Sequence, residues 1–405
     1  MPRPLLVTVC LLALASVSNT NSFGLVFARA AEGLNIDVAA LGGLRTIENG
    51  ASIIAALIVA PLIDRVPRKW LLLSGFGMST ISVYLLVLLD SVIGTVIFFA
   101  LNGAAMMQIF GALMAMPSDY VGGRQLNRLM GLIIGCIAFT SILVAPVVGN
   151  VADSHGWHAG MIVSSSVTGI AFLLTLLIVP TYWLPAVTET AGGFTARYRA
   201  VLDRKPLLIM LGSNLLRFAQ LSAILTFLST VMIQRYDLSL SVIGLIFSGV
   251  GVMFFISSLL SGMMLHWLRT FRILVWGGCA AVLLLALMLI NELPLHFMIP
   301  AVFIFIIVIA AQENTGTIAA LKLAGHARGA AMSWNELAAG VGALIGIGFG
   351  SIGLATGDVR GLGIALTLVA AIATIVSFLA LWYSGYTDES EDSGAVAPSG
   401  SSSVT

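Results

Sequence analysis

The sequence has very few charged residues. It contains 19 Lys and Arg and 18 Asp and Glu, so only 9% of its 405 residues are charged. About a quarter of the residues are charged in an ordinary soluble domain. So few charges could not cover the surface of a soluble protein of this length. Apolar residues make up 59% and the mean hydropathy is +1.05, which also excludes a disordered chain. The sequence therefore predicts an integral membrane protein.

Several other residue types and motifs are scarce or absent. The three cysteines lie in apolar runs without CxxC spacing, and five histidines occur without an HExxH motif, so neither a disulfide framework nor a metal site is predicted. No Walker sequence and no GxSxG motif is present, so we expect neither ATP hydrolysis nor an enzyme, and no cofactor. The net charge of +1 provides no field that would attract nucleic acid. A GxGxxG match at 348–353 lies inside an apolar run, which indicates close helix packing instead of nucleotide binding.

Long apolar runs are what the sequence has in abundance. Twelve runs of roughly 20 residues, without the alternation of a barrel strand, predict twelve transmembrane helices. The N-terminal run could also be a signal peptide, but we favour a retained first helix because the run continues through Phe23–Val26. The predicted limits are 4–26, 42–63, 70–90, 92–116, 127–151, 158–180, 206–230, 239–264, 273–291, 296–319, 329–354 and 361–383.

The basic residues are distributed unevenly between the loops. Fourteen of the 19 Lys and Arg fall in one set of loops with the N-terminus, three fall in the opposite loops, and two lie within spans. The positive-inside rule then places both termini in the cytoplasm. We expect the membrane to be a bacterial-type inner (plasma) membrane. The longest interior loop predicts a linker at 181–205 between six-helix halves at 1–180 and 206–385. The segment 386–405 is predicted to be a disordered cytoplasmic tail.

Two loops half a chain apart resemble each other. Asp64 precedes Gly75 by 11 residues, His266 precedes Gly277 by the same interval, and the two pairs are offset by 202 residues. This offset predicts two pseudo-symmetric six-helix halves in a parallel repeat. Such an architecture places a substrate site near the membrane midplane between the halves, with alternating access as they move.

Loop residues resemble the cytoplasmic signatures of the major facilitator superfamily. The loop after span 2 is similar to the pattern Gly-x-x-x-Asp-Arg-x-Gly-Arg-Arg/Lys, with Ala60 and Pro67 in place of the glycines. The resemblance implies a twelve-helix secondary transporter in which these charges form a cytoplasmic gate. The alternative is that the basic residues only set the topology. The predicted gate residues are Asp64, Arg65, Arg68, Lys69, Asp119 and Arg128.

Span 5 resembles one branch of this superfamily. Its segment 145–150 is similar to the Gly-Pro-x-x-Gly-Gly motif of the drug:proton antiporters, and Pro146 and Gly149 match that motif. The resemblance implies export and a kinked helix, and the alternative is generic helix packing. In span 4, where the branch has Arg-x-x-Gln-Gly, this chain lacks the arginine, and Asn102 replaces the glutamine.

Five charged residues fall within the predicted spans, where charge is costly and is a functional candidate. Arg45 and Glu48 in span 2 are three residues apart, so they share a helix face and can pair. They form either part of a binding site or a structural ion pair in the outer vestibule. The other three are Arg217, Glu313 and Glu336.

Polar residues accompany the charges of the second half. Asn214, Arg217 and Gln220 lie at intervals of three in span 7, which places them on one face, toward the bundle or a wet cavity. Arg217 is predicted either to bind substrate or gate the pathway, or to anchor neighbouring helices. The counterparts in span 1 are Asn19 and Asn21, which are uncharged.

Two acidic residues are candidates for proton coupling. Glu313 lies between Gln312 and Asn314 in span 10, and Glu336 follows Asn335 in span 11. Glu313 is the first candidate because burial favours the neutral form of a carboxyl group. Alternatively, Glu313 pairs with Arg217 or Lys322, and Glu336 caps or pairs near its helix start.

These patterns and the resemblance predict a secondary transporter that moves a small organic molecule by alternating access, with proton-coupled export. One alternative is uptake or exchange of an organic anion bound by Arg217, and another is a membrane sensor that does not transport. The expected partners are the substrate, the proton and the lipid bilayer, and the protein is expected to be a monomer.

Overall fold

The computed structural model describes residues 3–63, 66–116, 123–180, 203–291, 293–324 and 328–383. In these ranges the chain is helical apart from short turns and contains no strand. The first helices are α1 (Arg3–Ser16), α2 (Ser18–Gly33), α3 (Val38–Ile63), α4 (Arg68–Leu89), α5 (Val92–Ala115), α6 (Gly123–His155) and α7 (Trp157–Ile178). They are followed by α9 (Lys205–Tyr236), α10 (Leu240–Phe271), η2 (Arg272–Trp276), α11 (Gly277–Leu285), η3 (Ala286–Ile290), α12 (Leu295–Ala324) and α13 (Arg328–Tyr383).

The described helices form twelve membrane-crossing segments. Ten are long and apolar enough to cross a membrane by length and composition, and α1 and α2 together make one of them. The α13 segment contains two spans, because Gly357 and Asp358 have non-helical backbone angles and break it. Helix α3 adds a further segment of 26 residues. Helices satisfy every backbone polar group internally, as the bilayer requires, and the predicted all-α membrane fold is confirmed.

Tight turns join several neighbouring spans. Asp90 ends α4 in the left-handed conformation (φ 36°), and the hydroxyl of Ser91 then accepts a hydrogen bond of 3.2 Å from the amide of Gly94 at the start of α5. Asp237 (φ 51°) ends α9 in the same way, and Gly156 (φ 88°) separates α6 from α7. Asp is one of the few side chains that tolerates this backbone region, so the turn expected near Asp90 has a local cause.

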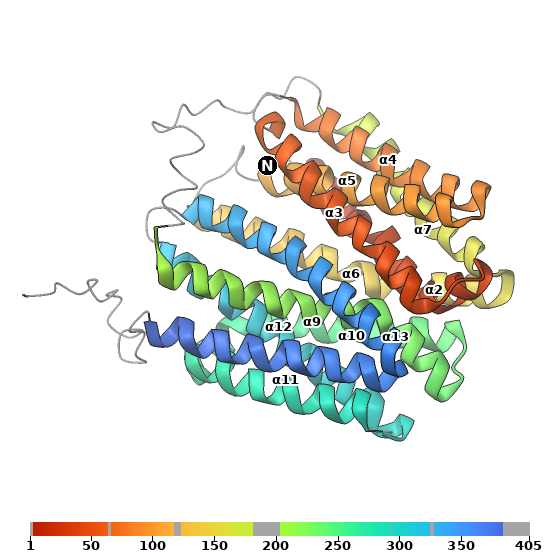
Figure 1. Ribbon diagram of the computed structural model, residues 1–405. Helices are drawn as coiled ribbons and strands as arrows, with labels where there is room; N and C mark the ends of the chain where they lie inside the picture. The colour runs from red at the N-terminus through yellow and green to blue at the C-terminus, as the bar shows by residue number, and fades with distance from the viewer. Residues whose placement is uncertain are drawn as a thin grey trace, which may run out of the picture.

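The helices form two bundles, α1–α7 in one and α9–α13 in the other (Figure 1). Contacts between the bundles run mainly along α6 with α10, α3 with α13, and α2 with α9. Most of the predicted linker and the whole of the predicted tail lie outside the described residues, so the limits of the two halves stay predictions.

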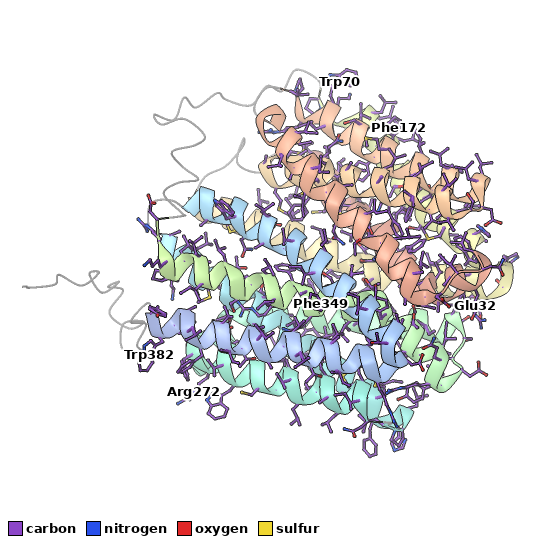
Figure 2. The ribbon with its side chains drawn as sticks, viewed as in Figure 1. Glu32, Trp70, Phe172, Arg272, Phe349 and Trp382 are labelled. Carbon is purple, nitrogen blue, oxygen red and sulfur yellow. The ribbon has the colours of Figure 1, made fainter. Side chains whose placement is uncertain are left out.

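The surface around the bundles is apolar. Leu88 and Leu177 are each 78% exposed, which suits a helix face in contact with lipid acyl chains. Trp70 and Trp382 point outward (Figure 2), as is typical of aromatic anchors at the membrane–water interface. The interior of the first bundle holds a cluster of phenylalanines in which the rings of Phe23 and Phe98 stack 5.1 Å apart.

The two bundles are in direct backbone contact at the end that carries the α2–α3, α6–α7 and α9–α10 connections. A Cβ atom added at Gly149 of α6 would overlap the carbonyl oxygen of Leu240 in α10. Nearby, the hydroxyl of Ser241 donates a 2.7 Å hydrogen bond to Asp153. This end is therefore closed, and the predicted orientation makes it the outer side.

Candidate functional site

Four of the five charged residues predicted within spans are almost completely buried. The exposed fractions are 5% for Arg45, 4% for Glu48, 1% for Arg217 and 6% for Glu313, whereas Glu336 is half-buried. The first two belong to the first bundle and the other three to the second. The charges therefore form two separate groups, one in each bundle.

In the first bundle Arg45 and Glu48 pair as their spacing predicts. Arg45 Nε lies 3.6 Å from Glu48 Oε2, and Arg45 Nη2 donates a 3.1 Å hydrogen bond to the backbone oxygen of Thr20. The other carboxylate oxygen, Glu48 Oε1, accepts hydrogen bonds from the hydroxyl of Thr20 (2.7 Å) and from the side-chain amide of Asn102 (2.8 Å). Both oxygens of Glu48 are thus engaged, and α2, α3 and α5 are joined.

A chain of hydrogen bonds continues from Asn102 across the bundle. Its Oδ1 accepts from the hydroxyl of Ser79 at 2.8 Å, and Asn19 donates to the backbone oxygen of Ser79 at 2.9 Å. The hydroxyl of Ser164 in turn donates to Asn19 at 2.7 Å. Asn21 lies apart from this chain and donates to Ser141 of α6 at 3.1 Å. Sequence reasoning selected the asparagines but missed the serines, because a serine in an apolar helix carries no distinguishing signal of its own.

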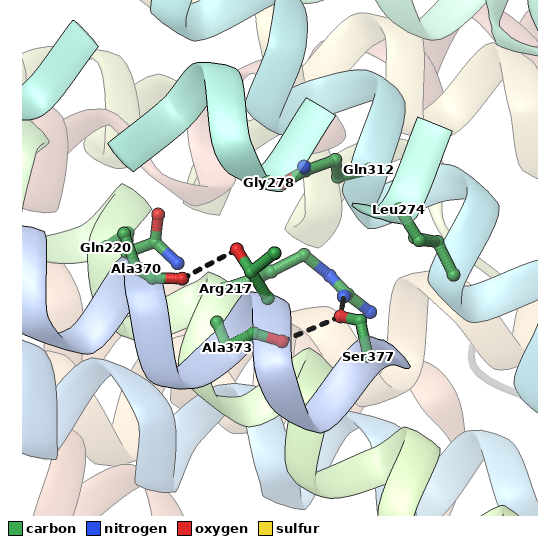
Figure 3. A pocket seen from close by; sticks show the side chains of 9 residues that line it. Arg217, Gln220, Leu274, Gly278, Gln312, Ala370, Ala373 and Ser377 are labelled. Carbon is green, nitrogen blue, oxygen red and sulfur yellow. Dashed lines mark hydrogen bonds between the residues drawn. The ribbon is translucent and has the colours of Figure 1, made fainter. Parts of the chain in front are cut away.

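In the second bundle Arg217 lies at the centre of a compact polar cluster. Its Nη1 donates to the hydroxyls of Ser213 (2.6 Å) and Ser377 (2.8 Å), and its Nη2 donates to Asn214 Oδ1. Asn214 also donates to Asn335 Oδ1 at 2.6 Å. Arg217 therefore connects α9 with both spans of α13, and Figure 3 shows its bond to Ser377. This geometry favours the helix-anchoring interpretation.

The surroundings of Arg217 leave little room for a ligand. Gly316 of α12 packs so closely that an added Cβ atom would overlap both the guanidinium and Asn214. The crevice beside Arg217 is lined by Gln220, Gln312 and Ser377 among others (Figure 3). Its walls come from helices of the second bundle alone, and it is too narrow for an organic substrate.

Glu313 of α12 is buried without a hydrogen-bond partner. Neither of its carboxylate oxygens accepts a hydrogen bond, so the direct pair with Arg217 that was one expectation does not form. Arg217 is nevertheless near enough to attract it electrostatically. Its neighbour Gln312 donates to the backbone oxygen of Ile273 at 3.4 Å, and the amide nitrogen of Asn314 is buried and unpartnered. Buried polar groups are almost always satisfied, so Glu313 is an exception that needs an explanation.

Glu336 adds a second acid to the same region. It interacts electrostatically with Glu313, and its neighbour Asn335 is buried and bonded to Asn214. Repulsion between two carboxylates disfavours the state in which both are charged. The predicted candidates Gln312, Glu313, Asn335 and Glu336 therefore belong to one neighbourhood, together with Arg217.

The predicted gate is only partly covered by the structure. Arg68 is buried at the start of α4, and Lys69 Nζ donates a 2.8 Å hydrogen bond to the backbone oxygen of Leu176 near the end of α7. Asp64, Arg65 and Asp119 and the side chain of Arg128 lie outside the described residues. The gate therefore stays a prediction.

The motif in span 5 lies at the boundary between the bundles. Pro146 is inside the continuous helix α6, and Gly149 packs against the start of α10. Contact is reciprocal, because a Cβ atom at Gly244 of α10 would be 2.7 Å from the backbone oxygen of Ala145. Small residues permit this approach of two helix backbones.

Comparison with protein families decides the class of this molecule. The model of the Major Facilitator Superfamily matches residues 9–320. The chain belongs to this superfamily. This superfamily protein is therefore a multi-pass membrane protein of a transporter family, and its twelve spans in two bundles agree with that membership. A search of curated proteins gives no match.

Solved structures share the fold at low sequence identity. A structure of the nucleoside transporter NupG has 13% identity and a TM-score of 0.73, covering 95% of this chain and 100% of its own. The peptide transporter POT in complex with sulfate has 12% identity and a TM-score of 0.76, covering 94% of each chain. A bacterial homologue of the human lysosomal transporter Spinster, in an inward-facing conformation, has 14% identity and a TM-score of 0.72, covering 93% of this chain and 96% of its own.

Proposed function

We propose that this protein exports a small organic molecule in exchange for protons by alternating access. The observation that supports proton coupling is the state of Glu313, a buried carboxyl group whose two oxygens have no hydrogen-bond partner. An unpaired charge inside a membrane bundle is costly. The packed arrangement around Glu313 in this structure therefore favours its neutral, protonated side chain. A carboxyl group that is neutral when its surroundings are packed and that ionises when water reaches it can carry one proton per transport cycle.

The surroundings of Glu313 suit reversible ionisation. Arg217 attracts the carboxylate without pairing with it, and Glu336 interacts with it as a second acid. A direct ion pair would hold Glu313 in the charged form, whereas attraction at a distance lowers the cost of ionisation once water enters. Movement of the bundles would admit that water.

Export is supported by the α6–α10 boundary. Pro146 and Gly149 resemble the drug:proton antiporter branch, and Gly149 lies where the bundles meet. We place the protein in a bacterial-type inner membrane as a monomer, with both termini in the cytoplasm and halves at 1–180 and 206–385.

Transport in proteoliposomes tests the proposal. The panel contains a lipophilic organic cation, a nucleoside, a dipeptide and benzoate; the nucleoside and dipeptide are included because structural neighbours transport these classes. For a transported compound, a pH gradient should drive accumulation in wild type, and Glu313→Gln should abolish accumulation while preserving exchange of substrate across the membrane.

The control is Glu32→Gln, which removes an exposed acid of the α2 end paired with Arg29, and it should transport as wild type does. Wild-type accumulation in Glu313→Gln would contradict proton coupling through this residue. Absence of flux for the whole panel would favour the non-transporting alternative. Anion uptake through Arg217 is a weaker alternative, because Arg217 is enclosed by its own bundle.

A further inference from the structure

We propose that Arg45 binds the substrate through an anionic group, so that the transported molecule carries a carboxylate. The inference rests on the proposed transport function and names a substrate class and a residue for it. It depends on the hydrogen bonds that Arg45 does not make, on its position at the boundary between the bundles, and on the geometry of a guanidinium group.

Arg45 has unused donors although it is buried. Its side chain is 6% exposed, and neither Nε nor Nη1 has a hydrogen-bond partner. The distance of 3.6 Å from Nε to Glu48 Oε2 is too long for a hydrogen bond. Its one hydrogen bond runs from Nη2 to the backbone oxygen of Thr20. Because a guanidinium carries five donor hydrogens, most of the binding capacity of Arg45 is unused.

Arg45 lies at the boundary between the bundles. A Cβ atom at Gly24 would be 3.4 Å from Arg45 Nη1 and 3.0 Å from the backbone oxygen of Leu225 in α9. These are close-packing distances, so Gly24 allows α2 and the guanidinium to lie against α9, and a ligand reaches Nη1 only when the bundles separate during alternating access. The ring of Phe27 lies 5.8 Å from the guanidinium carbon and covers one of its faces, so the edge with Nη1 is the part left for a ligand.

The chemistry of the free edge selects an oxyanion. The Nη1 and Nη2 hydrogens of a guanidinium form a planar fork that matches the two oxygens of a carboxylate. Arg45 of α3 packs against α2 inside the protein, away from the lipid-facing surface. We therefore assign the anion to a small organic carboxylate and not to a lipid headgroup.

Glu48 is the internal competitor for the same cation. Its Oε1 is satisfied by Thr20 and Asn102, so Glu48 stays in place if Arg45 turns toward a ligand. Glu48 contributes charge at 3.6 Å to Arg45 and thereby weakens the attraction of Arg45 for another anion. The two members of the pair should consequently affect anion binding in opposite directions.

Calorimetric binding to the full-length protein tests the proposal. The protein is held in nanodiscs of zwitterionic lipid, and the probes are acetate, benzoate, succinate and inorganic phosphate, with benzamide as the neutral counterpart of benzoate. We expect a carboxylate to bind more tightly than phosphate, and benzoate more tightly than benzamide. Arg45→Gln should weaken the best carboxylate about ten- to a hundredfold, as expected for lost charge-assisted hydrogen bonds.

Two variants separate binding from a structural role. Glu48→Gln should tighten carboxylate binding severalfold, whereas a merely structural pair predicts weaker binding in both variants. Arg29→Gln is the matched control, because Arg29 forms an exposed pair with Glu32 at the same spacing, and it should bind as wild type does. The thermal midpoint of each ligand-free variant shows whether that variant is folded. If Arg45→Gln does not fold, Arg45→Lys takes its place in the binding test.

The outcomes are distinct from those of proton coupling. Wild-type accumulation in Glu313→Gln would contradict proton coupling alone, and it leaves intact the Arg45 assignment, which is tested by binding to the Arg45 and Glu48 variants. Three results would each overturn the proposal. The first is that wild type binds benzoate and benzamide equally and binds no other probe. The others are an unchanged carboxylate affinity in Arg45→Gln and a weaker carboxylate affinity in Glu48→Gln. Displacement of the carboxylate by anionic lipid added to the nanodisc would also overturn it.

Discussion

The two bundles differ in which of their buried charged side chains has hydrogen-bond partners, the acid or the arginine. In the first, Glu48 accepts hydrogen bonds from Thr20 and Asn102, while Arg45 keeps unused donors. In the second, Arg217 donates to three side chains, while Glu313 keeps two unused acceptors. Arg217 Nε also has no partner, but its two terminal nitrogens are both bonded. Each bundle therefore holds one charge that is largely hydrogen-bonded and joins helices, and one charge with mostly unused hydrogen-bonding capacity. Our proposal that the anion binds in the first bundle and the proton in the second rests on this difference.

The largest expected effect on stability is that of Arg217→Gln. The change leaves Ser213, Asn214 and Ser377 without their shared donor, and unsatisfied buried groups cost roughly 1–3 kcal/mol each. We expect a loss of about 3 kcal/mol in the free energy of unfolding, measured by denaturation of the purified protein in detergent. Glu313→Gln is the matched comparison in the same bundle and should change stability by less than about 1 kcal/mol. If Glu313→Gln is as damaging as Arg217→Gln, the distinction between satisfied and unsatisfied charges fails.

A smaller loss is expected for Glu48→Leu in the first bundle. The substitution leaves Arg45 without its counter-charge and frees the donors of Thr20 and Asn102, so we expect a loss of about 2 kcal/mol. The same denaturation series gives the value, with Glu48→Gln as the milder variant. An unchanged or increased stability in Glu48→Leu would mean that the network of the first bundle does not hold its helices together.

The sequence predicted those parts of the site that depend on spacing within one helix. Three-residue intervals led to the Arg45–Glu48 pair and to the buried face that carries Asn214 and Arg217, and both are present. The glycines of the GxGxxG match were expected to pack closely, and Gly350 does contact Phe227 of α9. Helix periodicity is a local property, so a single sequence is enough to recover it.

Contacts between distant helices could not be predicted in the same way. Ser377 lies 160 residues from Arg217, and no pattern in either helix indicates that they meet. Gly149 was singled out by its resemblance to a motif, yet its partner Leu240 depends on how the two bundles approach. Which charge is satisfied and which is not also depends on these long-range contacts, and therefore only the structure distinguishes Arg45 from Arg217.

The most direct test of the account is an infrared titration that detects the protonated carboxyl of Glu313. Difference spectra are recorded on the purified protein in lipid for wild type, Glu313→Gln and, as the control, Glu32→Gln. We expect a carbonyl band of a protonated carboxylic acid near neutral pH in wild type and in Glu32→Gln, and its loss in Glu313→Gln. A wild-type spectrum without that band, or a band that persists in Glu313→Gln, would contradict the claim that Glu313 carries the proton.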